Sequence, residues 1–246
     1  MPIKFNSNKA LKEFYESGGK TNFPDSLKKV LSLIQNDDNI SNKKEASYLL
    51  ATAKAESDYS LQRWESDFLC GDIGVPYTDQ PCQKALNYYR SSDGKQNYYN
   101  LGVDSKGLPY FGRGLIQLTG KPNYESYGKK IGVDLIKDGD KALIPKNSYK
   151  IASEYLSGRT FKYVNKNDLT NARKSVNGGT KGLNETNTEY QRWLNIFSNE
   201  TPKKDVKFKE LFWTKNKRIL LYTFLGLSVV GFAFSLAYFT RVPDSK

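Results

Sequence analysis

The last part of the chain contains the feature that limits its structure most, an apolar run without a charge from Ile219 to Phe239. At about 1.5 Å rise per residue, a helix of this length would reach about 30 Å, the thickness of a bilayer core. A buried core helix is the alternative, but no other segment is apolar enough to surround a helix that is apolar on every face. The run therefore predicts a single transmembrane helix at 219–239, with the lipid bilayer as a partner.

The flanks of this run predict its orientation. Residues 199–218 are rich in lysine and read as a basic tether, whereas the tail at 240–246 holds two basic residues. Basic residues gather on the cytoplasmic side of a membrane span. The first residues lack the apolar stretch of a cleaved signal peptide. These patterns predict a single-pass membrane protein with a C-terminal anchor and its main domain on the cytoplasmic or virion-interior side.

Residues 1–198 have the patterns of a mainly α domain. Pro24 stands at a favoured first helical position, and Asn42 to Glu45 has the spacing of a capping box. An apolar stripe at helical spacing follows the capping box and ends just before Glu56. Further helices are expected near 146–157, 168–176 and 185–198. The stretch 71–110 is rich in Gly, Asn, Asp and Tyr, which predicts a small irregular or β lobe.

The composition excludes several kinds of chemistry. The chain has 38 basic and 26 acidic residues, a net charge of +12 that favours an anionic partner. Its basic residues are scattered among Tyr and Asn, which argues against nucleic acid. The absence of histidine excludes a His-based triad and most zinc sites, so acid–base chemistry must come from carboxylates, Tyr, Lys or Cys. Cys70 and Cys82 form either a disulfide or two free thiols, depending on the compartment. No metal or cofactor is expected.

Two carboxylates are candidates for acid–base work. Glu56 closes the apolar stripe, where partial removal from water would let a carboxyl donate a proton near neutral pH. Glu65 follows nine residues later. Glycoside hydrolysis needs such a pair, one acid and one base. Position alone favours a solvated glutamate at a helix end, and 26 acidic residues offer many pairs.

The sequence YFGRGLIQLTGKPNY at 110–124 is a more specific signal of function than the two carboxylates. Two glycines around Arg113 allow close approach of the backbone, and Gln117, Thr119 and Asn123 can all face one cleft. A buried strand with a polar outer face is the alternative.

This segment resembles the signature of glycoside hydrolase family 19, the plant-type chitinases and related bacterial and phage endolysins. The segment LLATAKAESDYS at 49–60 resembles the helix that ends in the family's His-Glu pair, and ARKSVNGGT at 172–180 resembles its Arg-x-x-x-Asn-Gly-Gly segment. The three motifs occur in the family's order between about Ala46 and Phe197. The resemblance implies a lysozyme-like helical fold and inverting hydrolysis of β-1,4 bonds in polymers of N-acetylglucosamine, either chitin or peptidoglycan.

The resemblance also implies roles for individual residues. Glu56 matches the general acid, Glu65 the base, and Thr119 the position that holds the attacking water. The positions that match sugar-binding residues are Gln117, Asn123, Tyr124 and Asn177, and those that match structural residues beside the site are Arg113 and Arg173.

Two departures from the family pattern raise an alternative. Ala55 replaces the family's His before the acid, and Asp58 and Tyr59 replace its usual glycines. A catalytically impaired membrane-anchored protein that reuses the fold, for carbohydrate binding or a structural role, is the second hypothesis. The substrate stays open: the charge and the glutamate spacing favour peptidoglycan, whereas the Tyr-rich lobe favours chitin.

Overall fold

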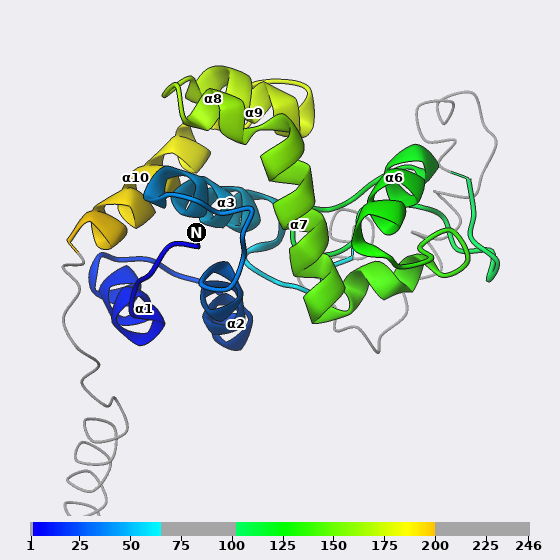
Figure 1. The fold of residues 1–246 in the computed structure, drawn as a ribbon, viewed down its shortest axis with the longest axis horizontal. Coiled ribbons are helices and arrows are strands. Elements are labelled where there is room, and N and C mark those ends of the chain that lie inside the picture. Colours follow the sequence, from blue (N-terminus) through cyan, green and yellow to red (C-terminus); the bar gives the residue numbers. More distant parts are fainter. Residues whose placement is uncertain (1, 65–101, 200–246) are drawn as a thin grey trace, which may run out of the picture. The chain divides into compact units, whose positions relative to one another are not determined.

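The computed structural model describes residues 2–64 and 102–199, which belong to one compact unit, Met1–Pro202. This part of the chain is mainly helical, as the sequence predicted (Figure 1). Its β structure is limited to isolated bridges that join Trp64 to Arg113, Val103 to Pro109, and Arg113 to Leu118. The predicted lobe at 71–110 lies mostly outside the described residues, as do both cysteines.

Within the described residues, helices occur at every position where a boundary signal or apolar pattern of the 1–198 domain predicted one. In chain order, the elements of the described ranges are α1 (Ser7–Glu16), α2 (Pro24–Ile34), α3 (Lys43–Ser57), α6 (Lys121–Ile131), the 3-10 helix η2 (Gly139–Leu143), α7 (Pro145–Arg159), α8 (Phe161–Val164), α9 (Leu169–Asn177) and α10 (Leu183–Ser198). Helices α1, α6 and α8 and the 3-10 helix η2 were not predicted. The start of α6 follows directly on the segment that read as a strand, so its helical pattern was obscured.

Helix α3 forms the centre of the core. Every residue from Glu45 to Ala53 is buried, and the large side chains Tyr48, Leu49 and Leu50 point to different sides of the helix. Small residues (Ala, Ser and Thr) lie between them, and α10 packs along α3 while α7 and α8 contact it as well (Figure 1). The predicted capping box is shifted by one residue: Asn42 accepts a hydrogen bond from Glu45 N (3.1 Å), but Glu45 accepts one from Ser41 N (2.7 Å).

The residues that end α3 adopt an unusual backbone conformation. Asp58 and Tyr59 have φ values of 53° and 67°, in the left-handed region that glycine enters most easily. Such a conformation costs about 1–2 kcal/mol for an ordinary residue. Side-chain contacts offset this cost: Asp58 accepts a hydrogen bond from Asn22 N (2.8 Å), and the buried Tyr59 hydroxyl donates to Glu189 and accepts from Trp193 Nε1 (3.0 Å). These contacts hold the end of α3 against the α1–α2 connection and against α10.

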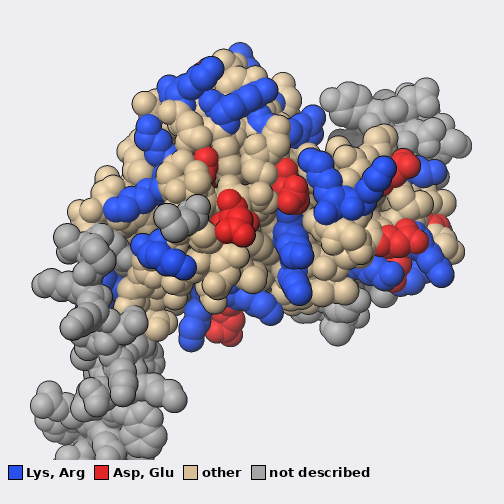
Figure 2. Space-filling model, in the orientation of Figure 1, with Lys and Arg blue, Asp and Glu red and all other residues tan. Residues whose placement is uncertain are grey.

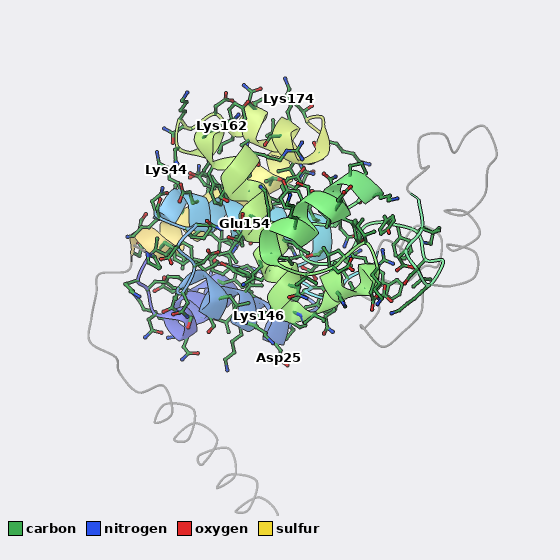
Figure 3. All side chains as sticks on the ribbon, turned by 45° about the vertical axis from the view of Figure 1, so that its right-hand side comes forward. Asp25, Lys44, Lys146, Glu154, Lys162 and Lys174 are labelled. Carbon is green, nitrogen blue, oxygen red and sulfur yellow. The ribbon has the colours of Figure 1, made fainter. Side chains whose placement is uncertain are left out.

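The described surface carries charges of both signs. Lys and Arg side chains are spread over several elements, with Asp and Glu between them (Figure 2). Figure 3 places Lys44, Lys162 and Lys174 toward one end of the unit and Asp25 toward the other. Basic side chains therefore occur on several elements, and some of them gather over α8 and α9 (Figure 2).

The predicted membrane location requires correction. No helix in residues 2–64 or 102–199 is long and apolar enough to cross a bilayer. The run at 219–239 that suggested the span, with its tether at 199–218 and tail at 240–246, lies almost wholly outside the described residues. None of the described helices therefore supplies the predicted anchor. The anchored, single-pass arrangement and the bilayer as a partner are therefore withdrawn.

Several buried tyrosines predict loss of stability in alkali. Burial raises the pKa of the Tyr48, Tyr59 and Tyr149 hydroxyls above the usual value of about 10. The Tyr149 hydroxyl also donates to Asp37 (2.7 Å), which favours its protonated form. Because these pKa values are higher in the folded state, their contribution is complete below about pH 10 and is lost as pH rises further. We expect the free energy of unfolding to fall by about 1.4 kcal/mol per pH unit for each such tyrosine.

Denaturant titrations between pH 8 and 12 measure this slope, and Tyr149→Phe should reduce it by the share of one residue. A free energy of unfolding that stays constant above pH 10 would contradict the assignment.

Candidate functional site

A cleft of about 510 Å³ opens at the C-terminal end of α3, between the loop that precedes α6 and the residues of α7 and α9 that face it. It is lined by Glu56, Ile116, Gln117, Leu118, Thr119, Asn123, Tyr155, Val176 and Asn177. Five of these residues were singled out in the sequence, from three separate motifs. The fold thus brings the three motifs to one site.

Glu56 lies in the last turn of α3, with its side chain 20% exposed at the cleft. Its Oε1 accepts a hydrogen bond from Arg173 NH1 at 2.6 Å. The Arg173 side chain is only 8% exposed, and its Nε donates to the carbonyl of Lys181 (2.9 Å). A charge-assisted bond of this kind fixes the carboxyl group. Arg173 therefore lies where a structural residue beside the site was expected, and it links Glu56 to the loop after α9.

The loop before α6 depends on a glycine. Gly114 has φ +76°, and a Cβ there would lie 2.6 Å from Ser148 Oγ and 3.0 Å from the carbonyl oxygen of Ala142. Without a Cβ the loop approaches α7 closely enough for Leu115 N to donate to Ser148 Oγ (2.9 Å), while Ser57 Oγ donates to Leu115 O (2.8 Å). The loop is thereby fixed between α3 and α7, which positions the polar residues that follow it.

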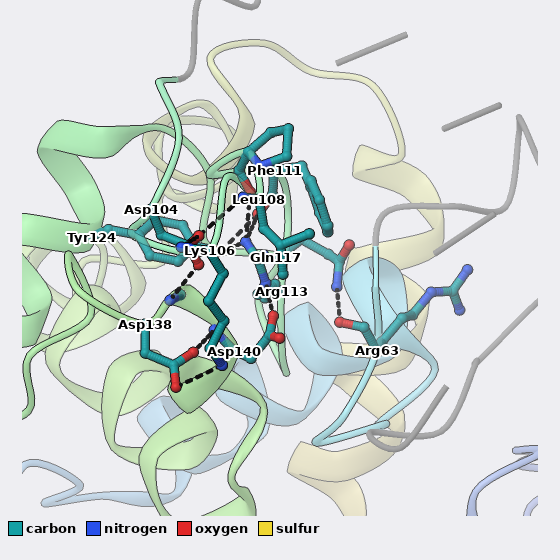
Figure 4. Close-up of polar contacts among 12 residues, drawn as sticks. Arg63, Asp104, Lys106, Leu108, Phe111, Arg113, Gln117, Tyr124, Asp138 and Asp140 are labelled. Atoms are coloured by element: carbon teal, nitrogen blue, oxygen red, sulfur yellow. Dashed lines mark hydrogen bonds and ion pairs between the residues drawn. The ribbon is translucent and has the colours of Figure 1, made fainter. Parts of the chain in front are cut away.

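The polar side chains of this loop and of the first turn of α6 donate hydrogen bonds to nearby backbone carbonyls. Gln117 Nε2 donates to the carbonyls of Gly114 (2.9 Å) and Arg63 (3.2 Å), as Figure 4 shows for Arg63. Thr119 Oγ1 donates to Gln117 O (2.8 Å), and Asn123 Nδ2 donates to Thr119 O (2.8 Å). Within the described ranges no donor reaches Gln117 Oε1 or Asn123 Oδ1. These residues therefore offer acceptor oxygens, which suit a ligand rich in hydroxyl and amide N–H groups.

Asn177 lies at the edge of the cleft, and its amide is bonded within its own loop. Its Nδ2 donates to Lys181 O (3.0 Å), and its Oδ1 accepts from Gly179 N (3.0 Å). The carbonyl of Lys181 thus receives hydrogen bonds from both Asn177 and Arg173. Asn177 and Arg173 together hold the loop at 178–182 against the site.

The predicted sugar-binding role of Tyr124 is wrong. Tyr124 is fully buried, and its hydroxyl donates to Phe111 O (2.7 Å) and accepts from Arg113 NH1 (3.0 Å). Asn123 and Tyr124 are successive residues of α6, so their side chains point about 100° apart, and only Asn123 faces the cleft. Tyr124 instead supports the loop from the core side.

Arg113 makes most of the contacts that support the loop before α6 (Figure 4). Its side chain is buried, with Nε bonded to Asp140 (3.0 Å) and NH1 to Pro109 O (2.8 Å), and the guanidinium lies 4.1 Å from the centre of the Phe111 ring. The position agrees with the expected structural role. Asp140 was not predicted, because nothing in its local sequence marks a partner 27 residues from Arg113. Tyr155 was also missed, since it reads as an ordinary residue of α7.

Glu65, the expected base, lies outside the described residues. The structure therefore places the expected acid, the Thr119 hydroxyl and three polar residues around one cleft, and it gives no distance between the two carboxyls.

Comparisons with known proteins identify the family of this chain. The sequence model of the glycoside hydrolase 19 family, described as class I chitinase, matches residues 32–155, which include Glu56 and the loop before α6. A glycosyl hydrolase family 19 domain-containing protein of Haemophilus influenzae is 37% identical over 79 residues, 32% of this chain and 38% of that protein's length.

Two solved structures show the same fold. Chitinase C from Streptomyces griseus has a TM-score of 0.53 at 16% identity, covering 81% of this chain and 95% of its own. Another bacterial family 19 chitinase has a TM-score of 0.51 at 19% identity, covering 81% of this chain and 97% of its own. At such identities the likeness concerns the fold alone.

Proposed function

Because the chain belongs to glycoside hydrolase family 19, a family of glycosidases, we propose that it hydrolyses β-1,4 bonds in a polymer of N-acetylglucosamine, chitin or peptidoglycan. The observation that carries this proposal is the cleft, which Glu56 lines together with Gln117, Thr119 and Asn123. Sugars offer many hydroxyl and acetamido donors to such a surface. A carboxyl beside them is the group that glycoside hydrolysis requires.

Glu56 is proposed as the general acid. Its Oε1 is held by Arg173, and within the described residues Oε2 has no protein partner, so Oε2 is the oxygen that would present the proton. Protonation of the bridging oxygen between two sugars turns it into a good leaving group. Arg173 serves as a positioning residue, since it orients the carboxyl without reaching the substrate.

Glu65 is proposed as the base on the strength of the family resemblance. An inverting enzyme separates its two carboxyls by roughly 6.5–9.5 Å to admit a water molecule. Thr119 is proposed to hold that water: its proton is donated to Gln117 O, so its oxygen is left to accept a hydrogen bond from the water. The water would attack the sugar carbon from the face opposite Glu56.

The test is an assay of the full chain on chitin hexasaccharide and on purified bacterial wall. New reducing ends support hydrolysis, and α-anomers as the first products, followed by NMR, support inversion. Binding without new reducing ends would instead favour the catalytically impaired carbohydrate-binding alternative, which the replacement of the family His by Ala55 suggests. If the folded protein neither binds nor cleaves either polymer, the proposal is refuted.

Thr119→Val should lower kcat by about 10- to 100-fold and leave KM nearly unchanged. Valine has the shape of threonine but no oxygen, and a hydrogen bond to a group that becomes charged is worth about 1.5–3 kcal/mol. Steady-state kinetics with the hexasaccharide measure both constants, and Thr119→Ser, which keeps the hydroxyl, is the matched control. An unchanged kcat for the valine variant would show that the hydroxyl takes no part.

A further inference from the structure

The glycan cleft shares two wall residues with a second hollow. Tyr155 and Val176 line the cleft at Glu56, and they also line an adjoining pocket of about 430 Å³ between α7, α8 and α9. A polymer that lies in the cleft and passes these two residues would bring its next substituents to the second pocket.

The second pocket is basic. Arg159, Lys162 and Lys174 line it, and no carboxylate is among its lining residues. Within the described part of the chain none of the three cations forms a salt bridge, although other lysines and arginines do. Figure 3 shows Lys162 and Lys174 at the same end of the unit, and Figure 2 shows basic side chains gathered there over α8 and α9. Among the described residues, therefore, no carboxylate forms an ion pair with these three cations, although Asp168 lies near enough to Lys174 to interact with its charge.

Aromatic rings orient two of these cations. The Arg159 guanidinium lies 4.9 Å from the centre of the Tyr155 ring, and Lys162 Nζ lies 4.9 Å from the centre of the Tyr163 ring. A ring face attracts a cation weakly and leaves its full charge available to an anion. Since Tyr155 belongs to both hollows, it connects the cation Arg159 directly to the glycan cleft.

We infer that this pocket is a subsite for carboxylates carried by the glycan. The inference rests on the proposed function and selects its substrate: chitin is neutral, whereas peptidoglycan carries acidic lactyl-peptide substituents along its sugar chain. A carboxylate in the pocket would meet three cations and no competing acid. The pocket therefore makes peptidoglycan the preferred substrate of the cleft, and Arg159, Lys162 and Lys174 determine that preference.

The test compares two triple variants of the full chain. One carries Arg159→Gln, Lys162→Gln and Lys174→Gln. The matched control carries Lys4→Gln, Lys28→Gln and Lys29→Gln, which removes the same charge from exposed lysines outside both hollows. Cleavage by each protein is measured on three substrates: purified peptidoglycan, the same peptidoglycan with its carboxyls amidated, and chitin hexasaccharide. Binding is measured by sedimentation with the two peptidoglycan preparations.

We expect the pocket variant to lose about tenfold in kcat/KM and in binding on native peptidoglycan, relative to the control, because exposed charge contacts are individually weak and three act together. The difference should vanish on amidated peptidoglycan and on chitin hexasaccharide, and it should shrink at high salt. Equal losses in the two triple variants would overturn the inference while leaving the proposed hydrolysis intact. If the parent cleaves neither polymer, the hydrolysis proposal fails, and the sedimentation assay still decides whether the pocket binds carboxylates.

Discussion

Glu56→Gln is expected to reduce kcat on the preferred glycan on the order of 10²- to 10⁴-fold, the usual contribution of a general acid. Glutamine has the size of glutamate, and its amide oxygen can still accept the bond from Arg173 that fixes the side chain. The variant lacks the acidic proton and the negative charge that pairs with Arg173. Release of reducing ends measures the loss, and an unchanged melting temperature shows that the fold is kept.

The matched control is Glu125→Gln, which neutralises an exposed carboxyl on α6 outside the cleft. Its kcat should remain that of the parent. A Glu56→Gln variant that keeps more than about a tenth of the parent kcat would place the general acid elsewhere.

Arg113→Met is expected to destabilise the fold by about 3–5 kcal/mol, the range found when one partner of a buried ion pair is removed. Methionine fills part of the volume but leaves Asp140 without its counter-charge and Pro109 O without its donor. Denaturant titration gives the free energy of unfolding. Because Arg113 holds the loop before α6, the variant should also lose activity at temperatures well below its own unfolding midpoint.

A double-mutant cycle with Asp140→Asn separates loss of the pair from loss of packing. Once the arginine is gone, neutralising Asp140 removes an unpaired charge, so the double variant should be less destabilised than the sum of the single variants. Strictly additive free energies would show that the two groups do not interact.

Local sequence signals predicted most of the helices. Pro24 and the Asn42 cap mark helix starts that depend on neighbouring residues only, and the structure has α2 and α3 at these positions. Helix α6 was missed because the alternation of Leu, Ile and Leu before it resembles a strand. In the structure that alternation belongs to a loop in which Gln117 and Gly114 take positive φ values.

The residues of the candidate site could likewise be predicted only in part from the sequence. Family motifs identified Glu56, Gln117 and Asn123 without any knowledge of contacts. Asp140 and Tyr155 could not be found in this way, because their importance comes from partners that are distant in the sequence. Tyr124 was expected to bind sugar from the family resemblance, whereas helical geometry turns it and its neighbour Asn123 to different faces.

The left-handed pair Asp58–Tyr59 also has a consequence for motion. The last turn of a helix ordinarily frays, opening and closing at little free-energy cost. Here the two residues that follow that turn are bonded to Asn22, Glu189 and Trp193, so the turn opens only if contacts with two other parts of the fold are broken. The carboxyl at this helix end therefore keeps its place between substrate encounters, and the cleft can begin each cycle already assembled.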